Sequence, residues 1–390
     1  MELQELLKKL CSTCDPTERL VSLALNVSKA SPPHPEGRGF HSSRLLSWLG
    51  SEEHPLTLRE ILRGVSGKME LHIETELRPE TEGLFVVAGP GLWESFELAV
   101  PIKDFLYVGP TPCIAPLLEA LTRMPRAYVI RFDQQEGILD EVSGGVRREI
   151  ERIPSVPVER DAQHQMSGHS ARNQAGSGRP ATRMGGGGRD RYEYCVEETV
   201  EAMLHQAADR VQTLQQKAPS ESIYAFGDRK HFPYFRDRLP ATLRSQAIHL
   251  GPLPHRHEEL LGKRIAEEQD SRVRNRVEAD ILEFQSRQAE QCYVASGPEV
   301  ILPLLDTGKV ARVFLDPGDP LPGTKCISCG SRGGACGHPL AATSMTQEVV
   351  SHALLHPPLP LTFVAPGAAW LKESGGMTAL LSEKGIHGRR

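Results

Sequence analysis

The sequence predicts a multidomain α/β (α+β) protein, and two observations carry that prediction: the length of the chain and the order of its apolar segments. The chain has 390 residues, 39% of them hydrophobic and 24% charged, which is an ordinary globular composition but too long for one core of typical size. Short apolar runs typical of buried strands alternate with longer segments of helical periodicity. We therefore expect two or three domains.

The composition also limits where the protein acts. The formal net charge is -5, which excludes a uniformly basic nucleic-acid coat and makes any RNA contact local. Met1 to Leu10 lacks the basic start and apolar stretch of a secretory signal, and no segment offers the roughly 18 apolar residues of a membrane helix. The eight cysteines are unevenly placed, which fits a reducing compartment. We expect a cytoplasmic protein with no membrane partner.

The clearest change of composition lies at residues 159–191. This segment holds seven glycines and six arginines but only three acidic residues. Such a segment cannot bury enough apolar surface to offset the entropy of ordering it, so we interpret it as a long, positively charged Gly/Arg-rich loop. The candidate RNA-binding residues in it are His169, Arg172, Arg179, Arg183, Arg189 and Arg191.

The segments on either side of this loop predict an α/β domain. Ala127–Phe132 and Ile138–Val142 are expected to be strands of a hairpin, because turn-forming residues separate them. Apolar residues between Tyr192 and Leu214 recur at spacings of three and four, which predicts an amphipathic helix of ~25 residues against the hairpin. Ile223–Phe226 is expected to be a buried strand. Residues 126–282 therefore form one α/β domain in this interpretation.

The order of these elements resembles that of a known family. The stretch from Tyr128 through Ser143-Gly144-Gly145 to Ser167-Gly168-His169 resembles the central domain of class 1 peptide chain release factors of the archaeal and eukaryotic type. It looks like the bacterial branch of that superfamily, which is related to Pelota and to the hibernation factor Balon. In the family a twisted hairpin precedes a loop carrying Gly-Gly-Gln, and one long helix follows. The resemblance implies a central mixed-sheet domain.

The likeness continues toward the carboxyl end of the chain. Tyr293–Val300 and Gly308–Leu315 resemble the family's third domain, in which a helix ending at a glycine leads into a strand of a small α/β/α sandwich. Ser374–Leu381 resembles the closing glycine turn and terminal strand of that domain. Between the second and third domains, Arg264–Arg287 alternates charges around an apolar stripe, which predicts a connecting helix.

The amino-terminal part matches more loosely. Leu20–Leu25 and Leu84–Gly89 resemble strands of the first domain, and Leu106–Leu121 resembles the connector of the bacterial branch. The resemblance implies three domains: an N-terminal release-factor-like domain (1–125), a central domain with the loop equivalent to the Gly-Gly-Gln loop (126–282), and a C-terminal α/β/α domain with a Cys/His zinc insertion (283–390).

Two departures from the family bear on function. Ser167-Gly168-His169 occupies the place of Gly-Gly-Gln, so the paired glycines and the glutamine that position the attacking water are absent. The family's codon-reading Asn-Ile-Lys-Ser and tyrosine-cysteine motifs are absent too, and Val27–Leu46 suggests a loop in their place. Codon-specific termination is therefore not expected.

These departures leave two functional hypotheses open. The first is a non-hydrolytic factor that binds the ribosomal A site in hibernation, stalling or rescue, through ribosomal RNA and tRNA, delivered by an elongation-factor-type GTPase. The second is a peptidyl-tRNA hydrolase or tRNA-cleaving rescue enzyme that uses the central loop, with His169 as a general base or with a nearby group. The missing tripeptide favours the first, and no catalytic residue is assigned.

A metal site is predicted independently of the family. Cys326-Ile327-Ser328-Cys329 is followed after six residues by Cys336-Gly337-His338, so that three thiols and an imidazole lie within thirteen positions. A Cys-x-x-Cys pair gives two thiolates to one ion, and the glycines between the pairs permit the chain to return. The predicted ligands of a structural zinc ion are Cys326, Cys329, Cys336 and His338; the alternative is an oxidisable, glycine-rich surface loop.

Overall fold

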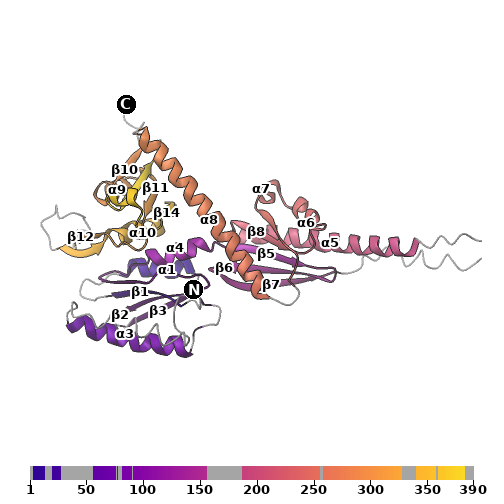
Figure 1. Ribbon diagram of the computed structural model, residues 1–390, viewed down its shortest axis with the longest axis horizontal. Coiled ribbons are helices and arrows are strands. Elements are labelled where there is room, and N and C mark those ends of the chain that lie inside the picture. Colours follow the sequence, from indigo (N-terminus) through magenta and orange to yellow (C-terminus); the bar gives the residue numbers. More distant parts are fainter. Residues whose placement is uncertain are drawn as a thin grey trace, which may run out of the picture. The chain divides into compact units, whose positions relative to one another are not determined.

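The structure is a computed structural model that describes residues 3–13, 20–27, 56–75, 77, 81–89, 91–155, 187–254, 258–290, 292–326, 340–356 and 359–382. The chain divides into two compact units, one of Met1–Met124 with Glu268–Arg390 and the other of Pro125–Glu267. Several sheets flanked by helices confirm the predicted mixed α/β class (Figure 1). The division into three domains stays a prediction. Within the described ranges, no helix has the length and apolar character of a membrane span.

The amino-terminal part of the first unit is built on an antiparallel sheet with the strand order β3-β2-β1-β4. Its strands are β1 (Leu20–Asn26), β2 (Gly83–Gly89), β3 (Leu92–Leu98) and β4 (Phe105–Gly109). Helix α3 (Leu56–Thr75) covers one face, and α1 (Leu3–Ser12) and α4 (Ala115–Arg123) cover the other. Because both faces are covered, most residues of β1 and β2 are apolar on both faces, and the polar Ser22 inside β1 is buried and accepts a hydrogen bond from the N–H of Cys113.

The carboxyl-terminal part of the same unit is a smaller sandwich. Its mixed sheet has the order β10-β15-β11-β14, with strands β10 (Val294–Ser296), β11 (Val310–Leu315), β14 (Leu361–Phe363) and β15 (Met377–Leu381). Helices α9 (Pro298–Asp306) and α10 (Met345–Leu355) pack on one face. Helix α11 (Ala369–Glu373) and the end of α8 (Glu258–Ala289) pack on the other. The predicted α/β/α layering is therefore present.

A buried polar contact links these two parts. Gln347 on α10 accepts a hydrogen bond from the backbone N–H of Ile114 at 2.8 Å, 233 positions away in sequence. Its amide nitrogen donates to Ser351 at 3.0 Å. Beside this contact, burial raises the pKa of the Cys113 thiol to about 12, so that this cysteine stays neutral and packs as an apolar side chain. The fold of the first unit thus depends on both of its chain segments.

The second unit is a five-stranded mixed sheet in the order β7-β6-β5-β8-β9. Its strands are β5 (Ala127–Phe132), β6 (Glu136–Ser143), β7 (Val146–Pro154), β8 (Ser222–Phe226) and β9 (Ala247–Gly251). Strands β5, β8 and β9 are parallel, whereas β6 and β7 are antiparallel additions. The long helix α5 (Gly187–Lys217) and the short α6 (Phe232–Arg238) lie on one face. The start of α8 lies on the other.

Most elements predicted for this unit are present. The hairpin and the strand Ile223–Phe226 correspond to β5, β6 and β8. The predicted amphipathic helix corresponds to α5, whose residues Met203, Ala207 and Val211 are buried against the sheet. In the first unit, the connector-like segment Leu106–Leu121 contains most of β4 and most of α4, so that its first part is a strand of the amino-terminal sheet.

Candidate functional site

The site begins where the arginine-rich segment leaves the central sheet. Strand β7 ends at Pro154, and the next backbone N–H, that of Ser155, donates to the carbonyl of Gln135 at 2.8 Å. The chain re-enters the described range at Gly187, the first residue of α5. Figure 1 shows the first turns of α5 extending past the strands of this sheet. The segment 156–186 therefore joins a strand end to the projecting end of a helix.

Ion pairs fasten α5 to its surroundings. Arg238 of α6 donates twice to Asp209 of α5, at 2.9 and 3.0 Å, and Arg210 of α5 bonds Glu151 of β7 at 2.6 Å. Nearer the start of the helix, Lys230 pairs with Glu197 and lowers the pKa of that carboxyl. These pairs are exposed, so each contributes little to stability. The buried apolar residues of α5, which pack in one cluster with residues of the strands, hold the helix on the sheet.

A cavity of about 840 Å³ opens at the same end of the sheet. It is lined by residues at the carboxyl ends of the parallel strands β5, β8 and β9 or just after them: Phe132, Asp133, Gln134 and Gln135 at the first, Gly227, Asp228, Arg229 and His231 at the second, and His249, Gly251, Pro252 and Leu253 at the third. The carboxyl ends of parallel strands are where α/β proteins commonly bind ligands. We call this cavity the strand-end pocket.

The backbone holds the two carboxylates of the strand-end pocket in place. One oxygen of Asp133 accepts hydrogen bonds from the N–H groups of Gln135 and Glu136, at 2.7 and 3.0 Å. One oxygen of Asp228 accepts from the N–H of Lys230 at 2.9 Å. Each carboxylate is thereby oriented and keeps a second oxygen that can accept from a ligand.

The cationic and aromatic groups of the pocket differ in how they are held. His249 Nε2 lies 3.0 Å from the carbonyl of Gly227, which fixes the ring and assigns the proton to that nitrogen. His231 is only 7% exposed and stacks on Tyr234, and its ring makes no hydrogen bond with the residues that the structure describes. Arg229 makes no ion pair within the same described residues.

Gly227 shapes the floor of the pocket. A Cβ at this position would lie 2.5 Å from a ring carbon of Phe132, which is itself buried at the end of β5. Only a residue without a side chain permits this approach, because the ring has no space to withdraw into a packed core. The glycine therefore brings the end of β8 close to β5.

The predicted RNA-binding residues fall mostly outside the described ranges. His169, Arg172, Arg179 and Arg183 lie outside them, and Arg189 and Arg191 belong to the first turns of α5, where only the backbone is described. The assignment of these residues to RNA binding stays a prediction. So does the loop predicted at Val27–Leu46, of which only Val27 is described.

Of the predicted zinc ligands, only Cys326 is described. It ends strand β12 (Pro322–Cys326) and pairs with Leu340, the first residue of β13 (Leu340–Ser344), so the other three ligands fall in the connection of a hairpin. Such a connection returns the chain on itself, which is the arrangement that a zinc knuckle needs. Among the described residues, no group of three or more potential ligands is present. Zinc stays a prediction.

We expect purified protein to carry about one zinc ion per chain, since four ligands fill a structural site. Replacing Cys329 by serine should remove the metal and lower the stability of the carboxyl-terminal sandwich more than that of the central unit. Elemental analysis after gel filtration measures the metal. The matched control is Cys292→Ser, an exposed cysteine outside the motif, which should retain zinc. Native metal-free protein of unchanged stability would contradict the assignment.

The strand-end pocket was not predicted from the sequence. Its residues come from three separated segments, and only the order of the strands in the sheet brings them together. A signal was present after two of the strands, since polar residues directly follow the apolar runs that end at Phe132 and Phe226. Strand β9 has no comparable apolar run, so its contribution was missed.

The central part of the chain is similar to release-factor-like proteins of the archaeo-eukaryotic type. Residues 112–269, less than half of the chain, match the profile of Bacterial archaeo-eukaryotic release factor family 10. This match includes the central sheet and α5, and it confirms the resemblance that the sequence predicts. None of the curated proteins matches the chain.

Several solved structures are similar over most of their length but at low identity. The archaeal translation termination factor aRF1 is 15% identical, with 97% of this chain and 96% of that chain covered and a TM-score of 0.25. Pelota from Archaeoglobus fulgidus is 11% identical, with 97% and 92% covered and a TM-score of 0.31. A ribosome-bound archaeal Pelota with ABCE1 is 11% identical, with 98% and 94% covered and a TM-score of 0.39.

Proposed function

We propose that the protein is a ribosome-associated, release-factor-like factor that occupies the A site without codon-specific termination, in hibernation, stalling or rescue. The central unit carries the proposal. In this unit the arginine-rich segment connects the end of β7 to the projecting start of α5. The unit also lies within the residues that match a release-factor family. Residues 159–191, which extend into the start of α5, hold six arginines against three acidic residues, and this is the charge expected for RNA binding.

The partners proposed with this function are ribosomal RNA and tRNA, with an elongation-factor-type GTPase for delivery, in the cytoplasm. The local basic segment supports an RNA partner, since the net charge of the whole chain is -5 and cannot supply the attraction. A delivery GTPase is proposed only from the resemblance of the sequence to the superfamily that includes Pelota.

Sedimentation with ribosomes tests the proposal directly. The protein should pellet with vacant ribosomes, and bound protein should slow the delivery of aminoacyl-tRNA to the A site, because both ligands need the same space. Pelleting at low salt without any effect on delivery would place the contact elsewhere on the ribosome and remove the A-site part of the proposal.

We expect no peptide release above background. Hydrolysis of the peptidyl ester needs a water in line with the carbonyl, and Ser167 and His169 replace the glycine and glutamine that the family uses for this purpose. The activity is measured as the release of labelled peptide from ribosomes that carry peptidyl-tRNA, both with each stop codon in the A site and with none. The double variant Ser167→Gly with His169→Gln tests whether the restored tripeptide recovers activity. Codon-independent release by the unmodified chain, lost in His169→Ala, would make the protein an enzyme.

A further inference from the structure

The strand-end pocket has the features of a ligand site that the proposed function leaves unused. Its volume, about 840 Å³, falls within the range of roughly 300 to 1,000 Å³ typical of small-molecule sites. His231 lines it with an imidazole that is 93% buried and makes no hydrogen bond with the described residues. Its ring nitrogens are not among the fully buried polar atoms that lack a partner, so water or a ligand in the pocket can reach them.

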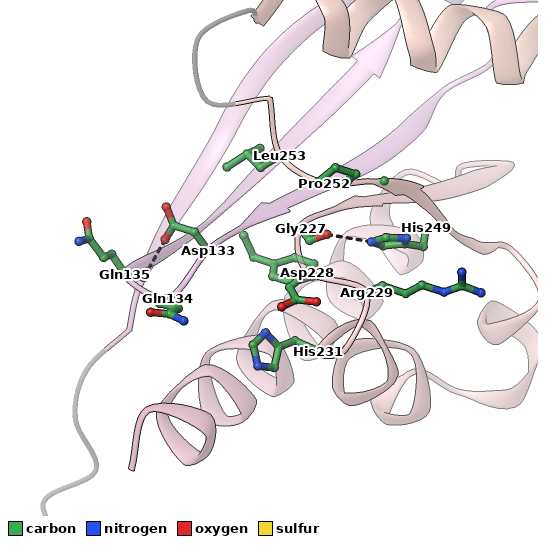
Figure 2. A pocket seen from close by; sticks show the side chains of 12 residues that line it. Asp133, Gln134, Gln135, Gly227, Asp228, Arg229, His231, His249, Pro252 and Leu253 are labelled. Carbon is green, nitrogen blue, oxygen red and sulfur yellow. Dashed lines mark hydrogen bonds between the residues drawn. The ribbon is translucent and has the colours of Figure 1, made fainter. Parts of the chain in front are cut away.

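The charged groups of the pocket are separated in space. Figure 2 shows Asp133 and Gln134 on one side, Arg229 and His249 on the other, and Asp228 between them. The first side accepts hydrogen bonds through a carboxylate whose orientation the backbone fixes. The second side has the exposed Arg229, whose guanidinium makes no ion pair in the described part of the chain and extends toward the outer rim, away from Asp133 (Figure 2). A complementary ligand therefore carries N–H donors at one end and an anionic group at the other.

The anionic end of the ligand fits a phosphate. A guanidinium binds phosphate oxygens through two parallel N–H donors, which makes arginine the usual partner of such groups. The donor end fits a nucleobase with an exocyclic amino group, because carboxylates accept hydrogen bonds from such amino groups. Pro252 and Leu253 line the same cavity and supply apolar surface for the planar base. The described residues of the pocket form no cluster able to hold a metal ion.

We propose that the strand-end pocket binds a nucleoside 5′-monophosphate unit whose base carries an exocyclic amino group, either as a free nucleotide or as the terminal nucleotide of an RNA. Arg229 contacts the phosphate, and Asp133 accepts from the amino group of the base. This inference does not rest on ribosome binding, since it is tested on the purified full-length chain alone.

The test measures binding of AMP, CMP, GMP and UMP by calorimetry at low salt. AMP, CMP and GMP should bind about tenfold more tightly than UMP, which lacks the amino group. Arg229→Gln should weaken all four by about tenfold, because the phosphate contact is common to them. Asp133→Asn keeps the oxygen that caps the turn but loses the charge, so it should abolish the preference over UMP while phosphate binding persists.

The control variant is Arg126→Gln. Arg126 directly precedes β5, at the end of the strand away from the pocket, and pairs with Glu141, so its replacement should change none of the four affinities. A short single-stranded RNA that ends in the preferred nucleotide distinguishes a free nucleotide from the end of an RNA as the ligand. If the RNA binds more tightly than the mononucleotide, the ligand is an RNA end. If it binds more weakly, the ligand is a free nucleotide. No binding at millimolar nucleotide, equal binding of inorganic phosphate, or an undiminished affinity in Arg229→Gln would overturn the proposal.

Discussion

Replacing Arg172, Arg179, Arg183 and Arg189 by glutamine should lower the affinity for ribosomes by about two orders of magnitude near physiological salt. Each arginine that neutralises a phosphate releases condensed counterions, and the logarithm of the binding constant then falls with the logarithm of salt by roughly 0.7 per contact with single-stranded RNA. Four lost contacts should flatten the salt slope by about 3. Sedimentation or light scattering over a salt series measures both quantities.

The matched control removes the same number of charges from described, exposed positions away from this segment. These are Arg126, Arg148, Arg264 and Arg274. The control variant should retain most of the affinity and nearly the full salt slope, since net charge alone does not position a contact. Equal losses in both variants would show that the basic segment has no special role, and the proposed function would lose its main support.

Replacing Arg131 by alanine should lower the free energy of unfolding by about 3 to 5 kcal/mol, which is the usual cost of leaving a buried charge without its partner. Arg131 on β5 donates twice to Asp140 on β6, at 2.6 and 3.1 Å. Their side chains are 9% and 1% exposed. The carboxylate would remain inside the sheet without its cation. Urea denaturation followed by circular dichroism measures the loss.

A double variant separates the ion pair from general packing. Arg131→Met with Asp140→Leu removes both charges and keeps apolar volume, so it should be considerably more stable than Arg131→Ala. The exposed pair of Arg238 with Asp209 provides the comparison: Arg238→Ala should cost about 1 kcal/mol or less. If Arg131→Ala unfolds no more easily than Arg238→Ala, the buried pair is not a significant source of stability.

The central unit shows what a single sequence can predict. Strand Ala127–Phe132 and the helix that follows the arginine-rich segment were predictable, because an apolar run and a spacing of three and four residues are local signals. The pairing of Arg131 with Asp140 was not, since it depends on the register of the hairpin. The strand-end pocket was missed for a related reason: strand order is a property of the whole sheet.

The amino-terminal part shows a second limit. Strand β1 was expected from the resemblance of Leu20–Leu25 to the family's first strand. Strand β3 carries Glu94 and Glu97 and is only partly buried at the edge of its sheet, so its apolar signal is weak. The contact between Gln347 and Ile114 spans 233 positions and has no local signature at all. The predicted zinc ligands and RNA-binding arginines stay predictions on the strength of residue type and spacing.

The buried contact of Gln347 has a consequence for the order in which the chain acquires its structure during synthesis. Residues 125–267 are continuous in sequence, so the central unit has all of its own partners before the remaining residues are made. The amino-terminal sheet is synthesised earlier, but its packing is incomplete until α10 has left the ribosome. Only then can Val350 complete the apolar cluster beneath α1, and Gln347 accept the hydrogen bond from the N–H of Ile114. A nascent chain halted before α10 therefore exposes apolar surface that chaperones bind.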